Sequence, residues 1–380
     1  MNEKPRLLWI ALKLFDKSVS KVTLLEMMKN MSRDFDIHFL TGWQDQRVDF
    51  SICDHPIQYF PQYGSGSVRK VSRRVLMRGA ARRHIRRLSP DVVLLNCTEN
   101  ASMIRTLAKA CREKGCKAIL DVRTVPTTEG DWRAWRAFGK GLEFASRHFD
   151  GITYITDEMR RYCRERYDLA NHRSAIWTSG VNTDAFGFGA ARPNGGPYRL
   201  IYHGGSISVN RGLDRLIRAM GQVSDLNVEL TLISSLREAA AIDWIHRLNL
   251  SGRITLLDTV PHSEVPAQIH RCHAGILPFP SCDAWNTSSP IKLFEYMACG
   301  RAVIVTDIPA HRNVLDEKPF AFFASDASPD ALSAAIRRAC SVRDQLPALG
   351  QAARQCAVTE HTWRRQAERL AAFVRDVLES

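Results

Sequence analysis

The 380-residue sequence lacks the long hydrophobic runs and paired cysteines that mark membrane-spanning or disulfide-bonded proteins. Its first apolar stretch, residues 7–12, is followed by Lys13 and is too short for a signal-peptide core or a transmembrane helix. The ten cysteines occur singly, without the spacing of a disulfide framework or a zinc site. These absences predict a cytoplasmic protein with reduced thiols.

Acidic residues are too few to balance the basic ones: there are 40 Asp and Glu, 53 Lys and Arg, and a net charge of +13. Part of the excess lies in residues 69–87, where basic and apolar residues alternate as in an amphipathic helix. Such a helix fits a solvated surface, an anionic membrane or nucleic acid. Because no Phe or Tyr is interleaved to stack on bases, we favour the membrane and expect no nucleic-acid partner. The basic residues are Arg69, Lys70, Arg73, Arg74, Arg78, Arg82, Arg83, Arg86 and Arg87.

The sequence also lacks internal repeats and low-complexity tracts. Short apolar runs alternate with helical segments, which predicts an α/β fold with parallel sheets flanked by helices. A Gly- and Pro-rich stretch, residues 187–198, interrupts the alternation and suggests a linker. We therefore expect two Rossmann-like domains, residues 1–186 and 199–360, followed by a helical segment in residues 361–380. The predicted strands are residues 7–12, 37–40, 57–60, 92–95, 118–122, 152–155 and 175–177 in the first domain, and 200–203, 228–234, 254–257, 275–277 and 302–306 in the second.

Residues 288–300, SSPIKLFEYMACG, predict a helix with well-marked ends. Ser289 is a favourable N-cap, Pro290 suits the first helical position, and Gly300 suits the left-handed residue that ends a helix. These boundaries place Lys292 in the first turn.

Lys292 and Glu295 carry the chemistry of this helix. A cation in the first turn lies beside the positive end of the helix dipole, and a ligand phosphate would relieve that unfavourable placement. Glu295 lies on the same side one turn later, where its carboxylate can accept hydrogen bonds from two sugar hydroxyls. Phosphate followed by ribose is the order of groups in a nucleotide. The alternative is a solvent-exposed Lys292–Glu295 ion pair without a ligand.

A glycine-rich loop follows the strand predicted at residues 200–203. Gly204 and Gly205 allow the backbone to approach a ligand, and Arg211 with Gly212 opens a helix whose N–H groups can face an anion. A tight turn without a ligand is the alternative.

These segments resemble the nucleotide-binding signature of retaining GT-B glycosyltransferases of family 4. In that family a helix that opens near a Lys carries a Glu that holds the donor ribose, and a Lys or Arg before a Gly binds the donor diphosphate. Lys292, Glu295 and Arg211 occupy these places. The resemblance implies two Rossmann-like domains facing each other across a cleft, with the C-terminal helix packing on the first. It covers nearly the whole chain and is strongest for residues 201–315.

Two positions depart from the family pattern. The earlier Glu of the family's pair is Thr287 here, and a second Arg of the glycine-rich loop is Gly205. The resemblance therefore assigns the donor sugar to Thr287, Ser288, Ser289 and backbone N–H groups. It assigns the donor base to the segment around Val260.

In the first domain, polar residues follow two predicted strands and are expected to face the acceptor. Glu99 follows one strand, and Asp121 and Arg123 lie at the end of the next. The loop after the first strand, with Lys13 and Lys17, is expected to support the leaving group.

We expect no metal cofactor. The diphosphate that leaves during glycosyl transfer needs nearby positive charge, which Arg211 and Lys292 would supply. The one Asp-x-Asp sequence, Asp34 with Asp36, stands at the entry to the second strand and is interpreted as a turn. Three histidines lie near one another in sequence but lack metal-ligand spacing, so we expect them at the surface or in caps. They are His262, His270 and His273.

The resemblance implies a retaining enzyme that moves a hexose from a UDP- or GDP-linked sugar to a saccharide acceptor. The leaving phosphate itself would deprotonate the acceptor hydroxyl. A lipid-linked acceptor at the inner face of the cytoplasmic membrane and a role in cell-surface polysaccharide biosynthesis are expected. Two alternatives stay open: a nucleotide-sugar epimerase of the same fold, and a catalytically degenerate GT-B binding protein.

Overall fold

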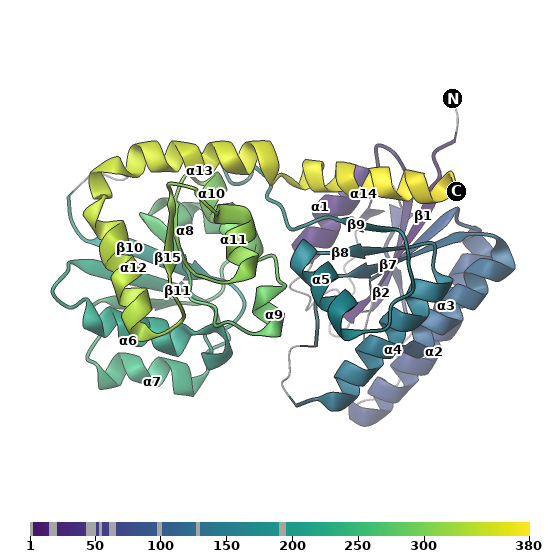
Figure 1. The fold of residues 1–380 in the computed structure, drawn as a ribbon, viewed down its shortest axis with the longest axis horizontal. Coiled ribbons are helices and arrows are strands. Elements are labelled where there is room, and N and C mark those ends of the chain that lie inside the picture. The colour runs from purple at the N-terminus through teal and green to yellow at the C-terminus, as the bar shows by residue number, and fades with distance from the viewer. Residues whose placement is uncertain are drawn as a thin grey trace. The chain divides into compact units, whose positions relative to one another are not determined.

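Figure 1 shows the fold in a computed structural model, which describes residues 3–14, 21–42, 51–52, 55–60, 66–96, 101–126, 130–189 and 195–380. The chain forms two compact units. Unit 1 comprises Met1–Thr178 and Trp363–Ser380, and unit 2 comprises Ser179–Thr362.

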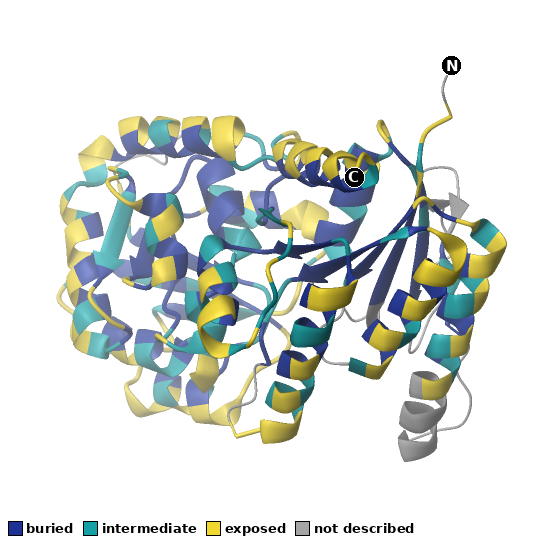
Figure 2. Cartoon of the chain, turned by 45° about the vertical axis from the view of Figure 1, so that its right-hand side comes forward, coloured by how far each residue is buried: buried dark blue, intermediate teal, exposed yellow. Residues whose placement is uncertain are grey.

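The centre of unit 1 is a seven-stranded sheet with the order β5-β2-β1-β6-β7-β8-β9, in which paired strands run parallel. The strands are nearly continuous apolar runs because helices cover the sheet, and Figure 2 shows them buried. The bounds are β1 (Arg6–Leu14), β2 (Asp36–Gly42), β5 (Gln58–Tyr59), β6 (Val92–Asn96), β7 (Lys117–Val122), β8 (Gly151–Tyr154) and β9 (Ser174–Ile176). A separate antiparallel pair joins β3 (Ser51–Ile52) to β4 (His55–Pro56).

The last helix of the chain belongs to unit 1, where it packs against α1 and β9. Its buried face includes Trp363, Leu370 and Val374. Gly151 at the start of β8 leaves room for it, because a Cβ there would lie 2.6 Å from Cζ of Phe373. The described helices of unit 1 are α1 (Lys21–Met31), α2 (Gly66–Leu88), α3 (Ala101–Lys114), α4 (Trp132–His148), α5 (Asp157–Arg166) and α14 (Trp363–Leu378).

Unit 2 is built on a six-stranded parallel sheet with the order β12-β11-β10-β13-β14-β15. Its strands are β10 (Tyr198–His203), β11 (Val228–Ile233), β12 (Ile254–Leu257), β13 (Ala274–Leu277), β14 (Ala302–Thr306) and β15 (Ala321–Ala324). Its helices are η1 (Val209–Arg211), α6 (Leu213–Gln222), α7 (Ala239–Arg247), η2 (His262–Glu264), α8 (Val265–His270), α9 (Asp283–Asn286), α10 (Ile291–Ala298), α11 (Pro309–Leu315), α12 (Pro329–Ser341), η3 (Arg343–Gln345) and α13 (Leu346–Glu360).

Both sheets reverse their strand order beside their first strand, between β1 and β6 in unit 1 and between β10 and β13 in unit 2. In open α/β sheets ligands bind at the carboxyl ends of the strands, at such a reversal. Each unit therefore has one edge where a ligand site is expected.

The predicted α/β architecture with two Rossmann-like domains is confirmed, and each predicted strand overlaps an observed one. The sequence did not predict β15, whose four residues AFFA contain no β-branched side chain and are mostly half-buried at the edge of the sheet.

The predicted linker at residues 187–198 is wrong as a domain boundary, because the chain enters unit 2 at Ser179. The backbone after this point is held by unit 2: Val181 N–H donates to the His361 carbonyl, and Arg354 donates to the carbonyls of Thr183 and Phe186. The Gly and Pro residues therefore mark a connection inside unit 2. The chain returns to unit 1 after Thr362.

The predicted basic helix is α2, and its apolar side packs on α3. Arg82 and Arg86 both pair with Glu113 of α3, at 3.2 Å and 3.0 Å, whereas the exposed Arg83 and Arg87 form no ion pair among the described residues. The side chains of residues 69–74 lie outside the described set. Among the described helices, none has the length and apolar content required to cross a bilayer. The described cysteines are free thiols, as predicted.

Candidate functional site

The glycine-rich loop lies at the strand-order reversal of unit 2, directly after β10. Gly204 and Gly205 have φ of 74° and 67°, a backbone conformation that favours glycine. Ser234, which follows β11, donates its hydroxyl to the Gly205 carbonyl at 2.8 Å and so fixes the loop.

Gly212 holds the start of α6 against the end of β13. Its φ is 73°, and a Cβ there would lie 2.0 Å from the Pro278 carbonyl oxygen. No larger residue fits this contact. The close approach places Arg211, the last residue of η1, at the carboxyl edge of the sheet.

Arg211 lies between the glycine-rich loop and an aromatic ring. A Cβ on Gly205 would lie 2.9 Å from Cζ of Arg211, and that Cζ is 4.9 Å from the ring centroid of Trp285. Trp285 donates Nε1–H to the Asn210 carbonyl at 2.8 Å and stacks on Phe279, with ring centroids 4.3 Å apart. Gly205 therefore leaves room for the guanidinium in its present position.

Lys292 extends from the first turn of α10 toward Tyr202 and Phe279. Its Nζ is 4.5 Å from the Tyr202 ring centroid, 5.6 Å from that of Phe279, and 3.5 Å from the Tyr202 hydroxyl oxygen. Burial lowers the pKa of Lys292, and Arg211 lowers it further, while Tyr202 opposes both. Among the described residues, neither cation forms an ion pair with a carboxylate. These two positive charges are available to an anion.

Glu295 is buried and bridged by two histidines, so the alternative of a solvent-exposed pair with Lys292 is wrong. His262 Nε2 lies 2.7 Å from Oε1, and His203 Nε2 lies 3.2 Å from Oε2. Burial alone would raise the pKa of Glu295, but the two imidazoles outweigh it and lower the pKa to about 2. The carboxylate is therefore charged at neutral pH.

The start of α10 differs from the prediction. Pro290, not Ser289, is the N-cap, and no side chain caps the helix. The Ser289 hydroxyl instead accepts the N–H of Ser179 at 3.1 Å, and the Ser179 hydroxyl donates to the Ser289 carbonyl at 2.7 Å. The end of the helix agrees with the prediction, because Gly300 is left-handed with φ 69°.

The other residues of unit 2 that were predicted to bind the nucleotide-sugar contact the protein's own backbone and core. Thr287 and Ser288 donate their hydroxyls to carbonyls of α9, those of Asp283 and Trp285, at 2.7 Å and 2.9 Å. Val260 is half-buried and packs against the core. None of these contacts identifies a sugar or base partner.

His311 is a further residue of this edge that sequence reasoning did not identify. It is fully buried, donates Nδ1–H to the Thr306 carbonyl at 2.7 Å, and stacks on Phe279 with ring centroids 6.0 Å apart. Its Nε2 has no hydrogen-bond partner among the described residues. Burial lowers the pKa of His311 to about 4, so the ring is neutral.

The three predicted histidines have different roles. His262, expected at the surface or in a cap, binds Glu295. His270 donates to the Gly187 carbonyl at 3.0 Å, and His273 Nδ1 accepts the Arg199 N–H at 2.9 Å. His203 was not identified at all, although its place directly before Gly204 was a usable signal.

In unit 1 the acceptor-side candidate Asp121 lies at the carboxyl end of β7 and is buried. It accepts hydrogen bonds from the Asn96 amide at 2.9 Å, the Thr153 hydroxyl at 2.8 Å and the Trp177 indole at 3.1 Å. Burial raises the pKa of Asp121, and Arg123 and the three donors only partly offset this.

Arg123 lies flat against Trp177, with Cζ 3.5 Å from the ring centroid, and donates Nη1–H to the Trp177 carbonyl at 2.6 Å. Burial lowers the pKa of Arg123 to about 10, and Asp121 opposes this shift. The guanidinium stays charged at neutral pH. Glu99, Lys17 and the side chain of Lys13 lie outside the described residues.

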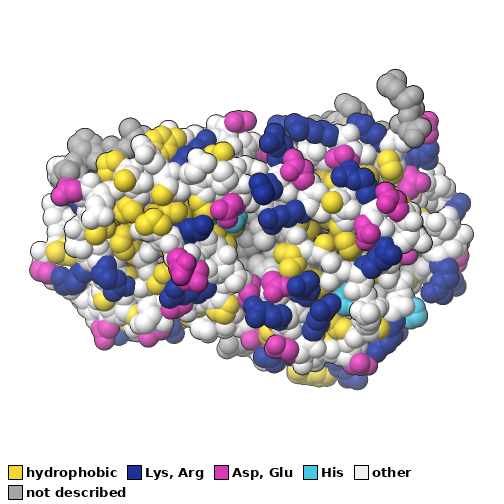
Figure 3. Space-filling model, turned by 45° about the horizontal axis from the view of Figure 1, so that its top comes forward, with side chains coloured by type: hydrophobic (Ala, Val, Ile, Leu, Met, Phe, Trp, Pro, Cys, Tyr) yellow, Lys and Arg dark blue, Asp and Glu magenta, His cyan; other side chains and the backbone are white. Residues whose placement is uncertain are grey.

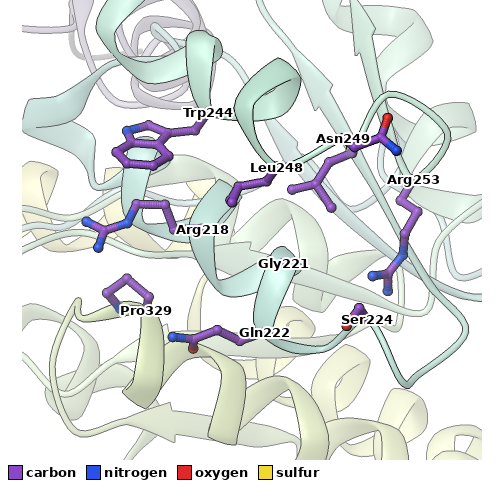
Figure 4. A pocket seen from close by; sticks show the side chains of 10 residues that line it. Arg218, Gly221, Gln222, Ser224, Trp244, Leu248, Asn249, Arg253 and Pro329 are labelled. Atoms are coloured by element: carbon purple, nitrogen blue, oxygen red, sulfur yellow. The ribbon is translucent and has the colours of Figure 1, made fainter.

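A pocket of about 560 Å³ lies elsewhere on unit 2, lined in part by Arg218, Trp244 and Asn249 (Figure 4). Much of its lining precedes β11 and β12, at the edge opposite to the glycine-rich loop. Arg253 in its wall donates to four backbone carbonyls and so has a structural role. No predicted site residue lines this pocket.

The described residues contain one group that could hold a metal ion: Cys356, Glu360 and His361 near the end of α13, with ligand atoms within 4.8 Å of one another. None of the predicted donor residues belongs to it. Asp34 and Asp36 lie at the amino end of β2, where Asp34 pairs with Arg375 at 2.8 Å.

Two family models match the sequence. A model described as Glycosyl transferases group 1 matches residues 197–341, and one described as Glycosyltransferase Family 4 matches residues 21–185. A search of curated proteins gives no match.

The structure resembles known glycosyltransferase structures over nearly its whole length. Sucrose-phosphate synthase from Thermosynechococcus elongatus aligns with a TM-score of 0.80 and 12% identity, covering 98% of this chain and 99% of that one. HepE from Anabaena, solved with UDP, gives 0.72 and 13%, covering 98% and 100%. WaaG, a glycosyltransferase involved in lipopolysaccharide biosynthesis, gives 0.71 and 14%, covering 97% and 99%.

At these identities the structural likeness establishes the fold, while the two family models together span most of the chain. Arg211, Lys292 and Glu295 lie within the part of the chain that the group 1 model matches. The chain therefore belongs to the group 1, family 4 glycosyltransferases and has the GT-B type of fold.

Proposed function

We propose that this glycosyltransferase moves a hexose with retention from a nucleotide-sugar, UDP- or GDP-linked, to a saccharide acceptor. The observation that carries the proposal is the pair of cations, Arg211 and Lys292, which lie beside the left-handed Gly204–Gly205 loop and pair with no carboxylate in the described part of the chain. HepE structures containing UDP and UDP-glucose support a nucleotide-sugar donor.

In this proposal the two cations bind the donor diphosphate and stabilise the charge that grows on it as the anomeric bond breaks. A unit-charge contact near 4 Å is worth about 4 kcal/mol at an effective dielectric of about 20. Glu295, ionised and buried, accepts hydrogen bonds from the ribose. The donor sugar lies near Thr287, Ser288 and Ser289, and Val260 contacts the base.

Retention without an enzymic nucleophile requires the acceptor hydroxyl to attack the face that the diphosphate leaves. The leaving phosphate takes the hydroxyl proton, so the site needs positive charge more than it needs a base. The acceptor side is assigned to unit 1, with Asp121, Arg123 and Glu99 as candidates.

We further propose that the reaction requires no metal, because Arg211 and Lys292 supply the positive charge. Chelator-treated enzyme should transfer sugar at the untreated rate. Loss of activity in chelator that manganese restores would contradict this part of the proposal.

For the acceptor we propose a lipid-linked saccharide used in cell-surface polysaccharide assembly. Support comes from the exposed Arg83 and Arg87 of α2, and from Trp132, which is 61% exposed beside Arg133 at the start of α4. Figure 3 shows a different side of unit 1, the one that carries α14, where Lys and Arg side chains are interspersed with Asp and Glu. The exposed side chains of α2 and α4 favour a peripheral protein at the inner face of the membrane.

Liposome flotation tests the membrane contact. Recovery should be higher with anionic than with neutral lipid, and the double variant Arg83→Ala/Arg87→Ala should lower it. The variant Arg82→Ala/Arg86→Ala removes the same charge from arginines that pair with Glu113, so it should lower recovery less. Equal recovery from both lipids would reject the membrane contact.

Thermal shift against a panel of UDP-, GDP- and ADP-sugars tests the donor site. One base class should stabilise the wild type, and Lys292→Ala and Glu295→Ala should lose the effect. Absence of any shift would favour the degenerate binding protein. Conversion of the nucleotide-sugar to its epimer without acceptor would favour the epimerase.

A further inference from the structure

The three residues His203, Glu295 and His262 form a bridge across three elements of unit 2. His203 is the last residue of β10, His262 is the first residue of η2, and Glu295 lies in the middle of α10. Each imidazole presents Nε2 to a different carboxylate oxygen, at 3.2 Å and 2.7 Å. Because an ionised carboxylate only accepts, Nε2 of His262 carries the proton of that hydrogen bond.

From this bridge we infer that His203 and His262 are positioning residues that orient Glu295 to read both hydroxyls of the donor ribose, so that the site selects ribonucleotides over deoxyribonucleotides. The inference rests on the proposed role of Glu295 toward the ribose and adds the two residues that set its geometry.

The arithmetic of lone pairs supports this role. Each carboxylate oxygen can accept about two hydrogen bonds. His262 occupies one position on Oε1, while His203 Nε2 lies 3.2 Å from Oε2 without the geometry of a hydrogen bond. At least one position on each oxygen therefore remains. A carboxylate held in this way presents one acceptor to each of two neighbouring hydroxyls, which is the pattern of a ribose 2′,3′-diol.

The two histidines differ in solvent exposure, and we therefore infer that they have different roles. The His203 side chain is 8% exposed and that of Glu295 is 4% exposed, whereas the His262 side chain is 44% exposed. His203 is thus an internal anchor. His262 lies on the accessible side of the carboxylate, where a ligand would approach.

Aromatic neighbours restrain both imidazole rings. Phe186 lies against His262, with ring centroids 5.1 Å apart, and Tyr296 meets His203 edge-on at 5.3 Å. Ordered rings fix the plane of the carboxylate before a ligand binds, which is how preorganisation improves affinity.

The test uses nucleotides that differ in one hydroxyl. Binding of UDP and 2′-deoxy-UDP, and of GDP and 2′-deoxy-GDP, is measured by calorimetry on the full chain. In the wild type we expect the ribonucleotide of the preferred base to bind about 10- to 100-fold more tightly, as for a hydrogen bond to a charged group.

Two variants of His262 separate positioning from packing. His262→Phe keeps an aromatic ring against Phe186 but loses the donor, and it should reduce the ribose preference at least fivefold, by weakening the ribonucleotide. His262→Gln keeps an N–H donor and should restore most of the preference. His203→Phe, which removes the nitrogen that faces Oε2, should act in the same direction as His262→Phe, provided that its melting temperature stays near that of the wild type.

The outcomes distinguish this inference from the proposed function. If UDP or GDP binds and Lys292→Ala abolishes binding, yet His262→Phe leaves the ribose preference unchanged, the inference is wrong and the donor site stands. If no nucleotide binds the wild type, the donor site and the inference both fall.

Discussion

The two sheets share the same strand order over six strands, but the two units treat the charges at the carboxyl ends of those strands in opposite ways. In unit 1, Asp121 accepts three hydrogen bonds and Arg123 is stacked on Trp177. In unit 2, Arg211 and Lys292 have aromatic neighbours but no carboxylate partner among the described residues. The fold brings these side chains to the carboxyl edge of each sheet, and the side chains themselves determine whether their charges are paired within the protein or left for a ligand.

The pKa values of the two buried carboxylates, Asp121 in unit 1 and Glu295 in unit 2, differ in the same way. Burial raises the pKa of both, yet the net shift is upward for Asp121 and downward, to about 2, for Glu295. Asp121 is held by neutral donors, with Arg123 as the nearby cation, whereas both oxygens of Glu295 face imidazoles. At Asp121 the nearby Arg123 and the three donors only partly offset the effect of burial, whereas at Glu295 the two imidazoles more than offset it.

The largest expected effect is on the unit 2 cations. Lys292→Ala or Arg211→Ala should lower kcat/KM for the nucleotide-sugar by about a thousandfold, equivalent to about 4 kcal/mol, because the leaving diphosphate loses a unit charge. Arg123→Ala in unit 1 is the matched control and should leave nucleoside diphosphate affinity unchanged. If all three variants lost nucleoside diphosphate affinity to the same extent, the proposed difference between the sheet edges of the two units would be wrong.

A second prediction concerns pH. The folded pKa of His311 is about 4, below its ordinary 6.5, so the unfolded state binds the proton more tightly. The stability that the neutral ring provides is present above pH 6.5 and is lost as pH falls toward 4, by about 3 kcal/mol. His311→Gln keeps a donor for the Thr306 carbonyl and should show a smaller loss in denaturant titrations. Parallel pH curves for the two proteins would contradict the prediction.

Asp121 should respond to pH with the opposite sign. Its folded pKa is raised, so its contribution is fully present below the ordinary value of 3.8 and is lost as pH rises through the folded pKa. Asp121→Asn should therefore cost less than about 1 kcal/mol at neutral pH, whereas Asp121→Leu leaves three donors unpaired and should cost about 3 kcal/mol. Urea unfolding followed by hydrogen exchange in unit 1 measures both.

The smallest expected effect separates two adjacent glycines. Gly204→Ala and Gly205→Ala both place a Cβ on a left-handed residue, at a cost of about 1 kcal/mol each. Only the Cβ at position 205 meets the Arg211 guanidinium, while the one at position 204 meets no atom within 4 Å. Gly205→Ala should therefore weaken nucleoside diphosphate binding several-fold more than Gly204→Ala. Equal affinities would mean that Arg211 does not need its present position.

Much of the fold and of the candidate site could be predicted from the sequence because the patterns that mark strands and those that mark site residues each span only a few residues. Alternating apolar runs identified the strands, and Gly204, Arg211, Lys292 and Glu295 each carry a marker within a few residues. Their convergence followed from the rule that carboxyl ends of parallel strands meet at one edge.

The missed features depend on contacts between distant segments. The Ser289 hydroxyl would cap α10 in isolation, but Ser179, 110 positions earlier, takes it. His262 is 33 positions from Glu295, and nothing near it in sequence indicates the contact. The boundary at Ser179 is also set by distant partners, namely His361 and Arg354.

The return of the chain to unit 1 has a consequence for how the protein is made. Unit 2 is one continuous segment, so all of its strands and helices have left the ribosome before α14 does. Unit 1 lacks the helix that covers α1 and β9 until residues 363–378 emerge, and its apolar surface there stays open until then. We expect the segment that is synthesised first to be the one that finishes folding last, the reverse of the usual order during translation.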